Sequence, residues 1–326
     1  GALENLDDMF EGYWDNQTEA AQVLATYNGE KVAVANQINS KLFYYRKDIF
    51  DECGVDPTAW ETVDDLIAGA KKIQETYPDY YIHNLSHSLG AQGYDNYLMF
   101  TAFDAKITDE NGDYIVNTDP GIRKGFEINK KLLDSGICFD SDDWKPEWEN
   151  GLASGQIIGE LTSSWFKNFI NGYAPEGEGK WTACLWPKEI AKGSEAGGSV
   201  YVIPIFAEHK EEAKEFLKYY RLEEAGTLAT FEEPASRTPT IKSVFESDIM
   251  KGDHWYLSAG EPYWQIEYES YTNGDFSIFP YTPQAVAEMN MINSWSTRYY
   301  TGELTLDEML NGLQDDLVMK IGRAHV

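Results

Sequence analysis

Residues 41–73 read KLFYYRKDIFDECGVDPTAWETVDDLIAGAKKI and combine one strand pattern with two helix patterns. The opening KLFYYR is short, apolar and aromatic, which is typical of a strand. The first helix pattern ends at Gly54 and Pro57, and a second helix is predicted to begin at Thr62, with Asp65 three residues later as in a capping box. The stripe predicted to be buried on this second helix comprises Val63, Leu66, Ile67, Ala70 and Ile73.

The same alternation of strands and helices continues on both sides of this segment. EKVAVAN (30–36) precedes it with a strand pattern, and SVYVIPIF (199–206) predicts a strand that leads into the helix EHKEEAKEFLKYY (208–220). A last helix is predicted to start near Thr305, capped by Glu308. Strands that alternate with helices indicate an α/β fold. The positions predicted to be buried in the helix 208–220 are Ala213, Phe216, Leu217 and Tyr220.

The composition excludes some classes of partner. The 326 residues carry 26 Lys and Arg against 55 Asp and Glu, a net charge of −29, which repels nucleic-acid phosphates and anionic lipid surfaces. We therefore expect no nucleic-acid partner and interpret the acidity as a well-solvated surface. Cys53, Cys138 and Cys184 show neither CxxC nor Cys/His spacing, so neither a disulfide framework nor a zinc site is indicated, and we predict no metal and no cofactor.

The run GELTSSWFKNF (159–169) places a large aromatic side chain, Trp165, among small polar residues after a short apolar strand. Thr162, Ser163 and Ser164 leave room and hydrogen-bonding capacity beside the indole. An aromatic floor with polar edges suits a sugar, because the C–H faces of a pyranose stack on the ring while its hydroxyls need polar partners. The alternative is a partly buried Trp that closes a strand-to-helix turn, and the sequence leaves both interpretations open.

Four segments together resemble the extracellular solute-binding proteins of family 1, the maltose-binding-like class. They are residues 41–73, quoted above, GIRKGFEINKKLLDSG (121–136), GQIIGELTSSWFKNF (155–169) and GGSVYVIPIFAEHKEEAKEFLKYY (197–220). They occur in the family's order and approximate spacing, and the resemblance covers nearly all of residues 1–320. Each segment is moderately specific, whereas four in order form a stronger signal.

The resemblance implies a two-lobe periplasmic-binding-protein fold with a three-segment hinge and the ligand in the interlobe cleft. On this basis residues 1–38 and 199–276 form the N-terminal lobe, which lacks its opening strands and helices, so that we expect it to expose apolar faces. Residues 39–198 and 277–320 form the C-terminal lobe. The end of the chain, IGRAHV (321–326), continues no pattern and matches the translation of a sequencing adapter, so we interpret it as a non-native tail.

The resemblance also implies which residues contact the ligand. Trp165 falls where the family places a sugar-stacking tryptophan, and Tyr94 falls where it places a stacking tyrosine, although an ordinary loop Tyr is the open alternative. Asn36, Gln37 and Asn39 follow a strand at the predicted cleft, where amides can donate to and accept from hydroxyls, or can simply terminate the strand. The set of predicted ligand-binding residues is completed by Asp95, Gly197 and Gly198, the two glycines serving either the ligand or the hinge.

The function that follows is the substrate-binding component of an ATP-binding-cassette importer, which captures a sugar or oligosaccharide by hinge closure and aromatic stacking. Its expected partners are the carbohydrate and the permease subunits. We expect a monomeric, non-enzymatic protein outside the cytoplasm, as a cell-surface lipoprotein or in the periplasm. The alternative is a glycoside hydrolase with a carboxylate pair in an aromatic-lined cleft, for which Asp95, Asp143 and Glu160 are the nearby candidates.

Overall fold

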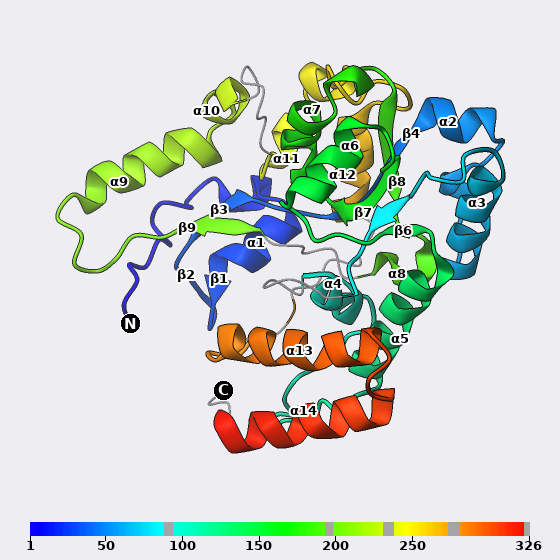
Figure 1. Ribbon diagram of the computed structural model, residues 1–326. Helices are drawn as coiled ribbons and strands as arrows, with labels where there is room; N and C mark the ends of the chain where they lie inside the picture. The colour runs from blue at the N-terminus through cyan, green and yellow to red at the C-terminus, as the bar shows by residue number, and fades with distance from the viewer. Residues whose placement is uncertain (88–93, 193–197, 231–237, 273–278, 280, 323–326) are drawn as a thin grey trace.

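The protein is described here from a computed structural model that covers residues 1–87, 94–192, 198–230, 238–272, 279 and 281–322. Helices and short strands alternate along the chain, as the sequence predicts for an α/β fold (Figure 1). Of the predicted tail, only residues 321–322 lie inside the described ranges, and 323–326 lie outside them.

The central sheet contains three antiparallel strands in the order β7–β4–β8, with bounds Gly159–Ser163, Lys41–Arg46 and Trp181–Leu185. The predicted strand KLFYYR is therefore confirmed, and it lies in the middle of this sheet. β4 pairs Lys41 with Ser163 at one end and Arg46 with Trp181 at the other. Because both faces of the sheet are covered, β4 is buried from Lys41 to Tyr45 and shows no alternation of polar residues.

Smaller strand pairs surround the central sheet. β3 (Val34–Gln37) pairs antiparallel with β9 (Ser199–Tyr201), with a bulge between Ala35 and Gln37. β5 (His83–Asn84) pairs parallel with β6 (Cys138–Phe139), and β1 (Thr26–Tyr27) forms a hairpin with β2 (Glu30–Lys31).

The helices cover both faces of the central sheet (Figure 1). The α-helices are α1 (Glu19–Ala25), α2 (Lys47–Glu52), α3 (Val63–Thr76), α4 (Tyr94–Ala102), α5 (Pro120–Ser135), α6 (Pro146–Ala153), α7 (Ile170–Tyr173), α8 (Lys188–Ala191), α9 (Lys210–Leu217), α10 (Glu224–Ala229), α11 (Lys242–Phe245), α12 (Tyr263–Thr272), α13 (Ala285–Tyr300) and α14 (Leu306–Lys320). Shorter turns are the 3₁₀ segments η1 (Trp14–Asn16), η2 (Pro57–Ala59), η3 (Ser164–Asn168), η4 (Pro175–Gly177) and η7 (Asp248–Lys251), and the π-helical η5 (Lys218–Leu222). Among the described helices, none has both the length and the apolarity needed to cross a bilayer.

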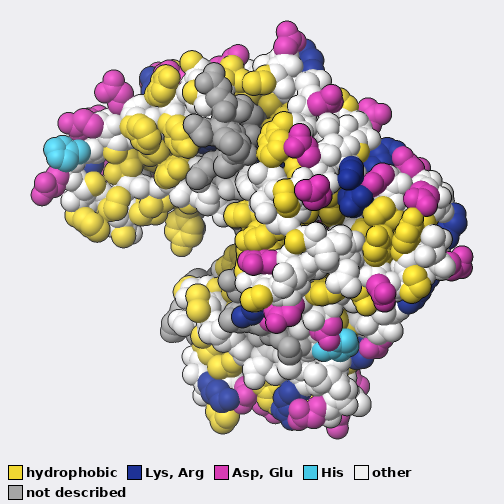
Figure 2. Space-filling view, turned by 45° about the horizontal axis from the view of Figure 1, so that its top comes forward, with side chains coloured by type: hydrophobic (Ala, Val, Ile, Leu, Met, Phe, Trp, Pro, Cys, Tyr) yellow, Lys and Arg dark blue, Asp and Glu magenta, His cyan; other side chains and the backbone are white. Residues whose placement is uncertain are grey.

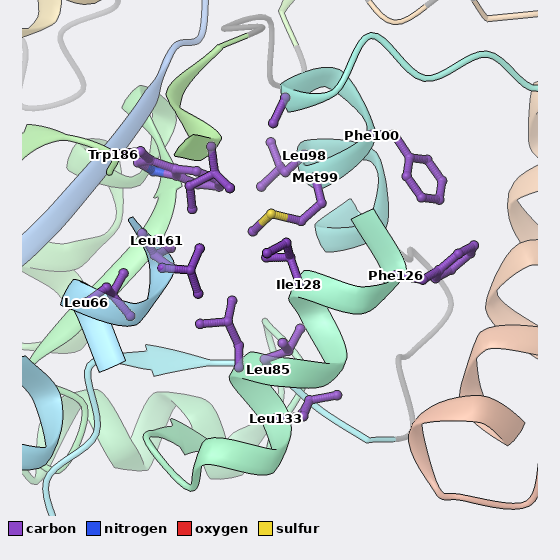
Figure 3. Packing of buried hydrophobic residues seen from close by; sticks show 14 of the residues in the cluster. Leu66, Leu85, Leu98, Met99, Phe100, Phe126, Ile128, Leu133, Leu161 and Trp186 are labelled. Atoms are coloured by element: carbon purple, nitrogen blue, oxygen red, sulfur yellow. The ribbon is translucent and has the colours of Figure 1, made fainter. Parts of the chain in front are cut away.

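Side chains of β4 alternate between two hydrophobic clusters. Phe43 and Tyr45 join the cluster formed with α3, α4, α5, α13 and α14, where Leu66, Leu98, Ile128, Leu161 and Trp186 pack together (Figure 3). Leu42 and Tyr44 join the opposite cluster, formed with α6, α7 and α12. This alternation follows from the two-residue period of a strand. The lobe limits stay predictions, and the structure adds that α12, inside the range 199–276, contacts β4 and β8.

Both predicted capping boxes are confirmed. At the start of α3 the Thr62 hydroxyl accepts from the Asp65 amide at 3.2 Å, and the Asp65 carboxylate accepts from the Thr62 amide at 2.9 Å. Thr305 and Glu308 make the same reciprocal bonds at the start of α14. The predicted stripe of α3 is buried except for Ile67, which is half-buried.

The segment from β9 through α10 forms an arm that projects from the body beside a hollow (Figure 2). Two predictions fail here. Of the expected strand 199–206, β9 covers only the part up to Tyr201, where its partner β3 begins, and beyond it Pro204 forms an isolated bridge with Leu3. Phe216, expected to be buried, is 60% exposed, because helical spacing sets which side chains share a face and not whether a partner covers it. The exposed apolar side chains of the arm are Val200, Val202, Ile205, Phe206, Phe216 and Tyr219.

Candidate functional site

The turn that carries Trp165 lies where the chain passes from β3 into β4. β7 ends at Ser163 opposite Lys41, so η3 begins beside the residues that precede β4. Ser164 bonds Ser40 twice, its amide donating to the Ser40 carbonyl at 2.9 Å and its hydroxyl accepting from the Ser40 amide at 3.2 Å. The turn that carries Trp165 is therefore held by the segment next to residue 38, where the predicted N-terminal lobe ends and the first of the three hinge crossings is expected, near Asn36 to Asn39.

The predicted amide residues lie against this turn. The Asn39 side-chain oxygen accepts from the Gln37 amide at 2.8 Å and from the Ser164 hydroxyl at 3.4 Å. Asn36 donates to the Ser199 hydroxyl at 2.9 Å and so links β3 to β9. Asn36 and Asn39 are buried, which makes them part of the framework of the turn, while Gln37 is half-exposed.

Of the two predicted residues at the start of α4, Tyr94 reaches the turn. The Tyr94 hydroxyl lies 3.1 Å from the Ser163 hydroxyl, and the ring is half-buried. The Asp95 carbonyl accepts from the Asn129 side chain at 3.2 Å, which fixes the start of the helix. Of the predicted glycines, Gly198 precedes β9, and Gly197 lies outside the described residues.

An aromatic patch, made of Trp144, Trp165, Phe169 and Tyr173, surrounds the turn. The Trp144 ring centroid lies 5.5 Å from that of Trp165, with 33° between the planes, and 4.9 Å from that of Phe169. Trp144 is 39% exposed and Phe169 is 40% exposed, whereas Trp165 is half-buried between them. The patch therefore presents aromatic surface to solvent beside hydroxyl and amide groups.

The sequence analysis missed Trp144. It follows the acidic run 140–143, which the sequence analysis assigned to a solvated surface. The backbone of Trp144 has φ 64°, a left-handed conformation that a bulky side chain rarely adopts and that costs about 1–3 kcal/mol. The surrounding rings hold it there, since Trp144 contacts Trp148 as well as the other members of the patch. The sequence did contain one signal for this role, because Trp148 follows Trp144 by four residues.

An acid cluster, made of His83, Asp95, Asp143 and Glu160, lies next to the aromatic patch. Glu160 on β7 and His83 on β5 are buried, with Oε1 of Glu160 at 3.0 Å from Nδ1 of His83. Asn84 donates to the Asp143 carboxylate at 2.8 Å. The patch and the cluster meet in the chain at 143–144 and are joined in space by Trp148, whose indole donates to the Asn84 side-chain oxygen at 3.1 Å.

Burial shifts the titration of this cluster toward uncharged forms. Burial, and then the nearby Asp143 charge, raise the pKa of Asp95 to about 7. Burial also raises the pKa of Asp143 and lifts the pKa of Glu160 well above its ordinary value, while it lowers the pKa of His83. Burial therefore disfavours the charged form of both members of the Glu160 and His83 pair.

Chemically, the site can stack a flat apolar face and bond several hydroxyl groups. Within the described part of the chain, His, Cys, Asp and Glu side chains form no group of three or more that could hold a metal ion. The candidate carboxylates of the hydrolase alternative lie together, but Glu160 is closed off with His83.

Comparison with curated proteins identifies sugar-binding relatives. The chain is 22% identical to an arabinooligosaccharide-binding protein of Halalkalibacterium halodurans, over 87% of this chain and 65% of that protein. It is 21% identical to an arabinooligosaccharide-binding protein of Bacillus subtilis, over 89% of this chain and 64% of that protein. The chain thus spans just under two thirds of the length of these relatives.

Solved structures confirm the two-lobe fold expected from the sequence. A binding protein associated with an ABC transporter of B. animalis subsp. lactis, in complex with β-1,6-galactobiose, matches with a TM-score of 0.78 and 23% identity, over 99% of this chain and 82% of that one. The galacto-N-biose/lacto-N-biose I-binding protein of Bifidobacterium longum matches with a TM-score of 0.76 and 18% identity, over 99% and 79%.

The family expected from the four sequence segments is confirmed by an independent match. The model of the family described as bacterial extracellular solute-binding protein covers residues 1–255 of the chain. The chain therefore belongs to the bacterial extracellular solute-binding protein family.

Proposed function

We propose that this protein captures a sugar or oligosaccharide and delivers it to an ATP-binding-cassette importer. The observation that carries the proposal is the convergence on one turn of a half-buried indole, Trp165, with the hydroxyls of Ser163 and Tyr94 and the amide of Gln37. These groups supply both a stacking face and hydrogen-bonding partners, which are the two things that a pyranose requires.

The physical basis of selectivity is the cost of an unmade hydrogen bond. Hinge closure, which is general among periplasmic binding proteins, removes water from the site. A stereoisomer that leaves one buried polar group unpaired then loses about 1–3 kcal/mol. Asp95, whose pKa is raised to about 7, adds an acceptor that becomes stronger as it ionises above that pH, because hydrogen bonds to a charged group are stronger than neutral ones.

The relatives support a carbohydrate ligand and a transport role. Two of them are arabinooligosaccharide-binding proteins, and two of the solved neighbours are complexes with galactobiose and lacto-N-biose. A family of extracellular binding proteins fits an extracytoplasmic location, and the partners are the carbohydrate and the permease subunits. We propose that the protein acts as a monomer, with Trp165 and Tyr94 as stacking residues and Gly198 at the hinge.

A glycoside hydrolase remains the second candidate because of one observation. Burial and then the nearby Asp143 charge raise the pKa of Asp95 to about 7, and an acid with a raised pKa near a second carboxylate is what glycoside hydrolysis requires. The relatives favour binding over cleavage, since they are named as binding proteins.

Calorimetric titration with arabino-oligosaccharides, β-1,6-galactobiose and lacto-N-biose, with reducing ends assayed in the same samples, tests this proposal. We expect a 1:1 complex with at least one sugar, no release of reducing ends, and weaker binding by Trp165→Ala but not by Phe216→Ala, an aromatic control on the arm. Failure to bind any sugar of a wide panel contradicts the proposal, and steady release of reducing ends favours the hydrolase.

A further inference from the structure

Lys167 is a fully buried lysine two residues after Trp165. It belongs to η3, and its side chain and that of Glu267 on α12 both have no exposed surface. The Lys167 ammonium donates to the Glu267 carboxylate at 3.1 Å, to the Thr238 hydroxyl at 3.0 Å and to the Ser164 carbonyl at 2.9 Å. The last of these bonds fixes the residue directly before Trp165.

The bonds continue from Lys167 to β3. Thr238 donates its hydroxyl hydrogen to Glu267, and its carbonyl accepts from the Arg221 guanidinium at 3.3 Å. Arg221, which is also fully buried, donates to the carbonyl of Asn36 and to that of Ala35. An unbroken set of polar contacts thus joins the Trp165 turn to the strand that leads into the predicted hinge crossing.

This network is expensive to bury. Removing a lysine and a glutamate from water carries a large desolvation penalty, and replacing such a pair with well-packed apolar residues is often neutral or stabilising. Stability alone therefore gives no reason for ions at this place. What an ion pair with fixed donors provides and an apolar pair does not is a defined geometry of the groups that it bonds.

The turn has little internal structure to hold that geometry, so it depends on contacts from outside, among them the bonds of Ser164 to Ser40. η3 is five residues long, and its N-cap residue Ser163 makes no side-chain capping bond. Short 3₁₀ segments have poor internal hydrogen-bond geometry, so external contacts decide how their side chains point. The Lys167 ammonium supplies one such contact inside the turn.

We propose that the buried network of Lys167, Glu267, Thr238 and Arg221 is a positioning device that ties the Trp165 turn to β3. The orientation of the Trp165 indole then depends on the position of β3. When the lobes move, the network keeps the stacking face of the indole in a defined orientation relative to that strand. The proposal rests on the proposed function only for the identity of the ligand as a sugar. None of the four residues is assigned a contact with that ligand.

The test replaces the pair with apolar residues in Lys167→Met/Glu267→Leu. We expect the unfolding midpoint to stay within a few degrees of the original, while the sugar Kd rises about tenfold, since a misplaced stacking ring loses about 1.4 kcal/mol. In protein labelled with 5-fluorotryptophan, the Trp165 resonance, assigned by its absence in Trp165→Phe, is expected to shift or broaden without sugar. The matched control is the exposed pair Arg123 and Asp307, 2.7 Å apart, changed in the same way to Met and Leu.

Thr238→Val is the milder variant, since it keeps the shape of the side chain and removes the bonds to Lys167 and Glu267. We expect the same change of the Trp165 resonance and about a threefold rise in Kd. An unaltered Trp165 resonance in folded Thr238→Val, or an unaltered resonance and affinity in the double variant, overturns the proposal. If the unmodified protein binds no sugar, the proposed function is wrong. The Trp165 fluorine resonance, measured without sugar, still shows whether the buried network positions the indole.

Discussion

The aromatic patch and the acid cluster adjoin the same turn but differ in their exposure to solvent. Trp144 and Phe169 of the patch are 39% and 40% exposed, whereas His83 and Glu160 of the cluster are 2% and 3% exposed. The patch leaves part of its apolar ring surface in solvent, although Trp165 and Tyr173 also pack against the core. The cluster keeps carboxylates inside, where their charged forms are disfavoured.

The difference shows that both regions give up stability, by different means. Exposed aromatic surface loses the free energy that burial would bring, about 25 cal/mol per Å². Buried carboxylates raise their own pKa values and lose stability when they ionise. Sites that sacrifice stability in this way are typical of function, and four substitutions separate the two contributions.

Trp165→Ala has the largest expected effect. The indole is the ring of the patch that lies on the turn itself, in contact with Trp144, Phe166 and Phe169. Truncation of a central aromatic side chain typically costs 2 kcal/mol or more, so we expect the sugar Kd to rise about 30-fold or more. Calorimetric titration measures this, and an affinity within about threefold of the original contradicts a stacking role.

Asp95→Asn is expected to raise the Kd about tenfold, because a neutral amide accepts a hydroxyl less strongly than a carboxylate does. Asp95→Asn is thus expected to weaken sugar binding but to increase the stability of the fold. The folded protein holds the Asp95 proton with a pKa of about 7, against 3.8 for the ordinary side chain. Protonated Asp95 therefore stabilises the folded protein fully at a pH below 3.8, and this stabilisation is lost as the pH rises through about 7.

Asp95→Asn removes that loss and should stabilise the protein at pH 8 by on the order of 1–3 kcal/mol, with the difference closing near pH 4. Thermal unfolding across this pH range measures it. The matched control is Asp307→Asn, since Asp307 is exposed in its ion pair with Arg123. A difference between Asp95→Asn and the original protein that does not vary with pH contradicts burial as the cause.

Trp144→Ala tests whether the residue that the sequence analysis missed contributes to binding. We expect about a fivefold rise in Kd, or about 1 kcal/mol, because Trp144 both offers surface and supports Trp165. Relief of the left-handed backbone does not follow, since alanine is strained at φ 64° as well. Trp144→Gly is the paired variant, and it should unfold at a higher temperature than Trp144→Ala.

Glu160→Gln has the smallest expected effect. Because burial lifts the pKa of Glu160 well above its ordinary value and so favours its uncharged form, a neutral amide of the same shape should change the Kd by less than about twofold and stability by less than about 1 kcal/mol. Titration and thermal unfolding at pH 7 check both. A large loss of affinity makes Glu160 part of the binding surface and removes the contrast between the two regions.

Local sequence patterns predicted the parts of the fold that short-range physics controls. The strand 41–46, the capping boxes at Thr62 and Thr305, and the strand-to-turn position of Trp165 depend on neighbours within a few residues. Hydrogen bonds and steric preferences of that range are present in the sequence itself.

The same patterns failed where burial depends on a distant partner. Phe216 has helical spacing but is 60% exposed on the arm, and β9 ends where β3 ends its pairing. Lys167 has the sequence context of a surface lysine, and it is buried because Glu267, 100 residues later, meets it in space. No local sequence pattern predicts the contact between Lys167 and Glu267.

The amino-acid sequence by itself determined the α/β class and singled out Trp165 as the candidate aromatic residue, because periodicity and residue type act locally, and the resemblance of four of its segments indicated the family. Only the tertiary structure decided that Trp144 completes the aromatic patch and that the buried pair His83 and Glu160 interacts electrostatically with the half-buried Asp95 and Asp143. It also decided that a buried ion pair orients the turn between them. Burial and charge interactions depend on distances in space, and these distances arise only when remote segments pack together.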